Sequence, residues 1–219
     1  MNLQTKSKFK DNLGLYVITT ESKERSHIDV AKAAIEAGIS IIQYRDKNSS
    51  SKILFERAKE LRKLTESSDA LLIINDRIDI AIAINADGVH LGQDDIYLDV
   101  ARKILGYDYI IGISATSYDE AIAASKSGAD YIGLGPIFPT PSKVDAAPPI
   151  GIEGLVEVRQ DVKIPIVAIG GITAENIEGV VLAGADGIAV ISAVASAPNM
   201  VEAAKLLKQK INHAKALGN

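Results

Sequence analysis

Eight short apolar runs recur along the chain, and segments of helical character separate each run from the next. The runs are residues 15–19, 39–45, 71–76, 88–92, 109–114, 131–135, 166–171 and 187–192. Short, nearly continuous apolar runs are typical of parallel strands that are buried on both faces. Eight such strands with helices between them in 219 residues predict an α/β fold, the (β/α)8 TIM barrel. A flavodoxin-like doubly wound sheet would need only about five strands.

An internal repeat supports the barrel. The stretches EAGISII, NADGVHL, SGADYIGL and AGADGIAV each place a turn of small residues, usually with Asp, just before runs two, four, six and eight. A repeated half-barrel unit would give this pattern. The alternative is that each copy is only a good helix stop, since Gly is common at helix C-termini. We therefore predict a single TIM-barrel domain over residues 1–219, with residues 1–12 as an N-terminal extension.

Composition narrows the classes of partner. The 24 basic and 28 acidic residues are mixed along the chain and give a net charge of −4, which offers no footprint for nucleic acid. Cysteine is absent, which excludes thiolate metal sites and fits a reducing compartment. No stretch approaches the roughly 18 apolar residues of a membrane span. We expect a cytoplasmic protein with small-molecule partners, no nucleic acid and no membrane, and a homo-oligomer stays open.

Two acidic residues follow neighbouring predicted strands. Asp76 ends the third run and Asp95 follows the fourth. Active sites of TIM barrels lie at the carboxyl ends of the strands, and neighbouring strands lie about 4.8 Å apart, so both carboxylates can reach one cation. Mg²⁺ commonly takes one or two protein carboxylates and completes its shell with water and phosphate oxygens. The alternative is that each Asp only caps the following helix.

Anion-binding groups are expected around the same rim. Gly170 and Gly171 after run seven and Ser192 after run eight would present backbone N–H groups to a phosphate. The alternative is a tight strand-to-helix turn that needs glycine. Taken one at a time, the basic residues Arg45, Lys47 and Lys143 are most simply interpreted as solvated surface charges. Grouped with the acidic pair, they indicate a site for more than one phosphate.

The stretch from 135 to 151 carries five of the seven prolines. Loops longer than about a dozen residues are usually functional lids or disordered linkers. Because predicted strands flank this one within one domain, we expect an ordered loop over the ligands. Among the histidines, His90 lies inside the fourth run and is expected to be a packed structural imidazole. No Ser/His/Asp set or HExxH pattern supports a hydrolase.

Seven motifs, in order and spacing, resemble the thiamin phosphate synthase family over about residues 13 to 206. They are QYRDK (43–47), NDRIDIA (75–81), DGVHLGQDD (87–95), IGIS (111–114), GPIFPTPSK (135–143), AIGGI (168–172) and GIAVIS (187–192). The resemblance implies a Mg²⁺-dependent transferase. It would join 4-amino-5-hydroxymethyl-2-methylpyrimidine diphosphate to 4-methyl-5-(2-phosphoethyl)thiazole, giving thiamin monophosphate and pyrophosphate through a pyrimidine carbocation.

The resemblance also implies roles for particular residues. The pyrimidine diphosphate would be bound by Gln43, Tyr44, Arg45, Asp46, Lys47, Asn75, Ser114 and Lys143, of which Arg45, Ser114 and Lys143 would be catalytic. The metal ligands would be Asp76 and Asp95, and the thiazole phosphate would contact Thr140, Pro141, Ser142, Gly171, Ile191 and Ser192. The chain departs from the family pattern at Tyr44 and Asp46, where Leu and Glu are usual, and it lacks the His that many members carry shortly after Ser114.

Two other functions fit the same scaffold. A thiazole tautomerase-like paralogue would bind a thiazole phosphate without a pyrimidine diphosphate, and a non-catalytic sensor would bind a phosphorylated ligand only. The first is disfavoured because the diphosphate and metal residues Lys47, Asp76, Asp95 and Lys143 are all present. The second would have little need for a pair of carboxylates opposite a phosphate site.

Overall fold

Eight parallel strands form a closed barrel in this computed structural model, which describes residues 2–140 and 147–218. The strands are β1 (Leu15–Ile18), β2 (Ile41–Tyr44), β3 (Leu71–Asn75), β4 (Gly88–Leu91), β5 (Ile110–Ala115), β6 (Tyr131–Leu134), β7 (Ile166–Ile169) and β8 (Gly187–Val190). Each strand pairs with the next along the chain, and β8 closes the ring by pairing with β1. The predicted TIM barrel is confirmed, and every strand falls on one of the eight apolar runs, within two residues at either end.

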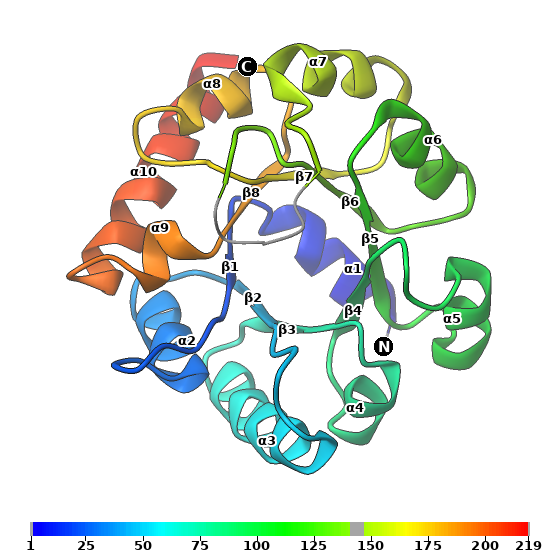
Figure 1. The fold of residues 1–219 in the computed structure, drawn as a ribbon, viewed down its shortest axis with the longest axis vertical. Coiled ribbons are helices and arrows are strands. Elements are labelled where there is room, and N and C mark those ends of the chain that lie inside the picture. The colour runs from blue at the N-terminus through cyan, green and yellow to red at the C-terminus, as the bar shows by residue number, and fades with distance from the viewer. Residues whose placement is uncertain (1, 141–146, 219) are drawn as a thin grey trace.

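Helices surround this ring on the outside (Figure 1). They are α2 (His27–Glu36), α3 (Ser51–Ser67), α4 (Ile78–Ala83), α5 (Leu98–Leu105), α6 (Tyr118–Lys126), α7 (Gly151–Asp161), α8 (Ile177–Leu182), α9 (Ser192–Ala195) and α10 (Met200–Gly218). Outward strand residues such as Ile42 and Ile74 share one buried apolar cluster with helix residues such as Leu54 and Leu61. Each fully buried side chain of this size contributes about 1.5–3 kcal/mol, so this layer supplies most of the driving force for folding.

The inside of the barrel holds a second apolar cluster that α1 (Asn2–Asp11) helps to complete. Figure 1 shows α1 lying behind the ring of strands. Its Phe9 is 1% exposed and places its ring 4.8 Å from that of Tyr131. Inward strand residues including Ile41, Ile73 and Ile110 pack in the same cluster. The helix therefore seals one end of the barrel interior with apolar side chains.

The repeated Asp before the even-numbered strands has a structural role. Asp87, Asp130 and Asp186 each accept a hydrogen bond from the first or second backbone N–H of the preceding odd-numbered strand, at 2.7–2.8 Å. Each also pairs with an arginine of the helix that precedes the same odd-numbered strand, at 2.6–2.8 Å. The sequence repeat therefore marks a repeated set of interactions, in which each Asp joins a strand to a helix. The alternative that each copy only stops a helix does not account for these interactions.

Across the part of the chain that the structure describes, none of the helices combines the length and apolar character needed to cross a membrane.

Candidate active site at the carboxyl end of the barrel

A cavity of about 480 Å³ opens among the carboxyl ends of the strands, a size typical of small-molecule sites. Ten of the sequence-predicted site residues line it: Gln43, Arg45, Lys47, Asn75, Asp76, Ser114, Thr140, Gly171, Ile191 and Ser192. They come from both sides of the ring, after or within β2, β3, β5, β6, β7 and β8. The barrel thus brings most of the predicted residues to one cavity, although the sequence scatters them over 150 positions.

Of the described site residues, Tyr44, Asp46 and Asp95 do not line this cavity, so the predicted contact of Tyr44 and Asp46 with the ligand stays a prediction. Successive strand residues point to opposite faces, so Gln43 and Arg45 reach the cavity while the Tyr44 side chain between them points outward. The Tyr44 side chain is buried on the outer side, edge-on to the His27 ring at 4.9 Å, and its hydroxyl donates to Asp46 at 3.3 Å.

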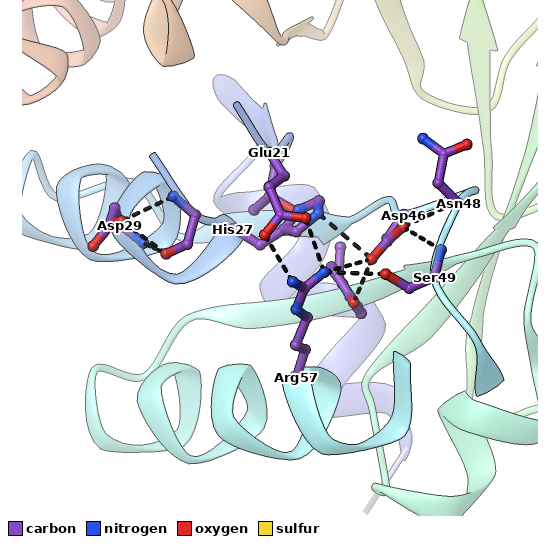
Figure 2. Close-up of polar contacts among 10 residues, drawn as sticks. Glu21, His27, Asp29, Asp46, Asn48, Ser49 and Arg57 are labelled. Atoms are coloured by element: carbon purple, nitrogen blue, oxygen red, sulfur yellow. Dashed lines mark hydrogen bonds and ion pairs between the residues drawn. The ribbon is translucent and has the colours of Figure 1, made fainter. Parts of the chain in front are cut away.

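Asp46 is instead the centre of a polar cluster between the barrel and its outer helices (Figure 2). Its carboxylate accepts hydrogen bonds from the Arg57 guanidinium at 2.9 Å and from the backbone N–H groups of Asn48 and Ser49 at 3.0 and 3.1 Å. Burial raises the pKa of Asp46, but hydrogen bonds from Ser49 and Asn48 outweigh it and bring the pKa down to about 2. The cluster fixes the loop that carries Arg45 and Lys47.

Replacing Asp46 by Asn is expected to lower the free energy of unfolding at pH 7 by about 2 kcal/mol, the equivalent of the pKa shift from 3.8 to about 2. The native pKa lies below the unfolded value, so this contribution is present above pH 3.8 and is lost as the pH falls through about 2. Urea unfolding at several pH values measures it, with Asp108→Asn on an exposed loop as the control. Equal stability of Asp46→Asn and wild type at pH 7 would contradict the anchoring role.

The acidic pair lies together, and neither carboxylate caps a helix. Helix α4 begins after Arg77 and α5 after Tyr97, each without a side-chain cap. The Asp95 carboxylate accepts from the Gly92 N–H at 2.6 Å, and burial and a hydrogen bond with the Asp76 carboxyl raise the pKa of Asp95. The helix-capping alternative is therefore wrong for both residues. Lys47 lies beside the pair, with its Nζ 3.2 Å from Asp76 Oδ2.

This donor set suits a hard divalent cation. Among residues 2–140 and 147–218, no three or more His, Cys, Asp or Glu side chains gather where they could hold a metal ion. Asp76 lines the cavity, and Asp95, which is not among the lining residues, is in hydrogen-bond contact with Asp76. Adjacent carboxylates of this kind suit Mg²⁺ when water and substrate oxygens supply its other ligands. Bringing two carboxylates together raises the pKa of one of them, and a cation would remove that repulsion.

His90 is a packed imidazole with both ring nitrogens hydrogen-bonded, as the sequence predicted, but its place in the cavity wall was not predicted. It lines the cavity, and its Nε2 lies 2.9 Å from the Ser114 hydroxyl. Burial in the barrel interior lowers the pKa of His90 to about 4, so the ring is neutral at pH 7. Its position in β4 places it on the inward face, opposite to the outward Val89 and Leu91. Strand alternation was the signal that could have found it.

The other side of the cavity is formed by Thr140, Gly171, Ile191 and Ser192. Gly170 and Gly171 have φ values of 96° and 63°, which side chains rarely adopt, so the turn after β7 depends on glycine. This turn lies against the start of the proline-rich loop, where Phe138 N–H donates to Gly170 O at 3.0 Å. Three predicted contacts of the loop, Pro141, Ser142 and Lys143, fall outside the described residues.

A closed (β/α)8 barrel with a carboxylate pair, basic side chains and a glycine turn at the cavity formed by the carboxyl ends of its strands has the organisation of a TIM-barrel enzyme. The comparisons agree on the family. The family model described as thiamine monophosphate synthase matches residues 15–194. The chain belongs to this family, and thiamine-phosphate synthesis, a transferase reaction, is its activity.

Individual relatives are similar over nearly their whole length. A thiamine-phosphate synthase of Chloroflexus aurantiacus is 50% identical over 200 residues, which cover 90% of this chain and 92% of that one. One from Methanospirillum hungatei is 46% identical over 202 residues, covering 91% and 98%. Among solved structures, a thiamine phosphate pyrophosphorylase from Pyrococcus furiosus superimposes with a TM-score of 0.88 at 43% identity, covering 94% of this chain and 98% of that chain.

Proposed function

We propose that the cavity binds a pyrimidine methyl diphosphate and a thiazole phosphate side by side and joins them with release of pyrophosphate. The observation that supports this proposal is that two sets of candidate anion-binding residues line one cavity. Lys47 and Asp76 follow β2 and β3, whereas Gly171 follows β7. In a ring of eight strands β3 and β7 are diametrically opposite, so two phosphorylated substrates can enter head to head with their reactive ends between them.

The diphosphate would lie against the β2–β4 side. Arg45, Lys47 and Asn75 would donate to its oxygens, with the fork of Arg45 suited to two oxygens and Lys47 acting as a compact charge. Asp76 and Asp95 would hold Mg²⁺, which supplies positive charge to the diphosphate when bound. The ion pair between Lys47 Nζ and Asp76 Oδ2, at 3.2 Å, supports this arrangement because it brings a basic and an acidic group together where the diphosphate and Mg²⁺ would meet.

The thiazole phosphate would lie against the β7–β8 side. Gly171, Ile191 and Ser192 would bind it through backbone and side-chain donors, with Thr140 from the loop beside them. The roles of Pro141, Ser142 and Lys143 in the same subsite, and of Lys143 toward the diphosphate, belong to this proposal as inferences from the family motif GPIFPTPSK.

Bond making and breaking need no covalent nucleophile from the protein. The methylene C–O bond breaks and its electron pair leaves with the diphosphate oxygen, while the aminopyrimidine ring supports the cationic carbon. The thiazole nitrogen lone pair then forms the new C–N bond. The protein stabilises charge on the leaving group with Arg45 and the loop Lys143, positions both reactants, and excludes water with apolar walls such as Ile18, Val167 and Ile169. Its cytoplasmic location is part of the same proposal.

Arg45→Lys tests the diphosphate assignment. Lysine keeps the charge but loses the two-pronged geometry, so the KM for the pyrimidine diphosphate is expected to rise about tenfold, while the KM for the thiazole phosphate stays within about twofold. Initial-rate kinetics with each substrate varied in turn give both values. An increase confined to the thiazole phosphate would place the diphosphate elsewhere.

A further inference from the structure

A chain of four hydrogen bonds crosses the barrel interior at the wall of the cavity, and all five of its residues line that cavity. Gln43 Nε2 donates to the Tyr16 hydroxyl at 2.9 Å, and this hydroxyl lies 3.0 Å from that of Tyr131. The Tyr131 hydroxyl lies 2.9 Å from His90 Nδ1, and His90 Nε2 lies 2.9 Å from Ser114 Oγ. The chain links β2, β1, β6, β4 and β5 and ends at a cavity residue on each side.

The barrel is built around the rings of this chain. A Cβ on Gly112 would lie 2.1 Å from the Tyr131 ring, and a Cβ on Gly133 would lie 2.7 Å from His90 Cε1. Both strands therefore omit a side chain where a ring of the chain passes. Tyr16 and Tyr131 are each 1% exposed, and Phe9 packs on the far side of Tyr131. The rings are consequently held in place before any ligand arrives.

With the Gln43 amide oriented so that Nε2 faces the Tyr16 hydroxyl, counting donors gives the direction of every hydrogen bond in the chain. The Tyr16 oxygen accepts from the Gln43 amide, so the Tyr16 proton goes to its other neighbour, the Tyr131 oxygen. The Tyr131 proton then has one acceptor left, Nδ1 of His90. A neutral imidazole that accepts at Nδ1 carries its proton on Nε2, and it donates that proton to Ser114 Oγ.

The direction of these hydrogen bonds determines where the Ser114 hydroxyl proton points. Because its oxygen accepts from His90, the Ser114 hydroxyl proton must point to another acceptor, and no second hydrogen-bond partner of this hydroxyl is found within residues 2–140 and 147–218. The cavity, whose wall Ser114 forms, is the remaining direction. The opposite direction of the chain would turn the serine proton toward His90 and offer the substrate only lone pairs.

We propose that Tyr16, Tyr131 and His90 are positioning residues that hold the Ser114 hydroxyl as a hydrogen-bond donor to the pyrimidine diphosphate. This inference rests on the proposed function for the identity of the acceptor, but the direction of the chain is a property of the free protein. The relay exchanges no proton with the substrate. It orients one hydroxyl, in the way that a buried partner fixes the tautomer of a catalytic histidine.

The tautomer of His90 tests the direction of the hydrogen-bond chain, and this test needs no substrate. In ¹⁵N-histidine NMR of the free protein at pH 7, we expect His90 Nδ1 to be of the unprotonated type and Nε2 to carry the proton. His90→Gln identifies the resonance, which is needed because His27 and His213 are also present. A His90 ring protonated at Nδ1 would mean that these hydrogen bonds run in the opposite direction, and this would overturn the proposal even if the enzyme proved fully active.

A double-mutant cycle tests the consequence for catalysis. Tyr131→Phe removes one hydroxyl and should lower kcat about tenfold with little change in the KM for the thiazole phosphate, and Ser114→Ala should lower it at least as much. If Tyr131 acts through Ser114, the double variant is no slower than Ser114→Ala alone. If the kcat loss of the double variant equalled the product of the two single losses, Tyr131 would not act through Ser114 and the proposal would be overturned.

A folding control accompanies the cycle. Tyr118→Phe removes a hydroxyl that donates to Asp161 on the exposed surface, and it should retain wild-type kinetics. If Tyr131→Phe does not fold, Tyr16→Phe takes its place in the cycle, since it interrupts the chain one step earlier. Inactivity of every variant and of the wild type, together with the expected tautomer, would count against the proposed function and leave the direction of the chain standing.

Discussion

Asp76→Asn is expected to reduce kcat by at least about a hundredfold at the Mg²⁺ concentration that saturates the wild type, equivalent to about 2.7 kcal/mol. The substitution removes one of two carboxylates that lie in contact beside Lys47. Asparagine is the sharper choice than alanine because Asp76 has φ 61°, a conformation that Asn adopts more readily than other side chains with a Cβ. The fold should therefore survive, and the loss should come from weaker Mg²⁺ binding.

Activity measured as a function of Mg²⁺ concentration separates the explanations. Partial recovery of Asp76→Asn at high Mg²⁺ identifies a weakened metal site. Asp94→Asn is the matched control, since Asp94 is exposed, adjacent to Asp95 and absent from the cavity wall. If Asp76→Asn showed the same Mg²⁺ dependence as the wild type, Asp76 would not be a metal ligand.

Gly171→Ala is expected to raise the KM for the thiazole phosphate about tenfold or more and to destabilise the protein. An added Cβ would lie 2.6 Å from the Pro139 carbonyl oxygen and 2.7 Å from Phe138 Cβ, so the turn and the loop must separate. The residue also has φ 63°, which costs a side chain roughly 1–2 kcal/mol. Both effects move the backbone groups that face the phosphate.

Gly106→Ala is the control for this substitution. Gly106 has φ 73°, and a Cβ there would meet no atom within 4 Å. Its φ is also positive, so a side chain there is strained too but meets no clash, and it ends α5 on the outside of the barrel. Thermal unfolding should show a larger loss for Gly171→Ala than for Gly106→Ala. A KM for the thiazole phosphate that stays at the wild-type value in Gly171→Ala would remove this turn from the phosphate subsite.

The fold could be predicted from sequence because its signal is periodic. Eight buried parallel strands require eight apolar runs, and the order of strands in a barrel follows the order of the chain. The pairing of Asp76 with Asp95 could be predicted for the same reason, because adjacent strands end side by side. The repeat before the even-numbered strands was visible too, but its interactions with Arg62, Arg102 and Arg159 were not, since nothing in the sequence marks an arginine as the partner.

The side-chain positions that the sequence did not reveal depend on the alternation of residues along a strand and on contacts across the barrel. Tyr44 and Asp46 belong to a predicted ligand-binding run, yet Tyr44 is turned outward by the alternation of β2, and Asp46, just past the strand, is held by Arg57 of α3. His90 and Tyr131 meet only because β4 and β6 face the same barrel interior, 41 positions apart in the chain. Contacts of this kind come from closing the ring, and local sequence patterns carry no signal for them.

The most direct test of the account is product formation by the purified protein. The protein is mixed with 4-amino-5-hydroxymethyl-2-methylpyrimidine diphosphate and 4-methyl-5-(2-phosphoethyl)thiazole, with Mg²⁺ or with EDTA, and thiamin monophosphate and pyrophosphate are both quantified. We predict equimolar formation of the two products with Mg²⁺ and at least about a hundredfold less with EDTA. Binding of the thiazole phosphate without any product at saturating substrates would contradict the account.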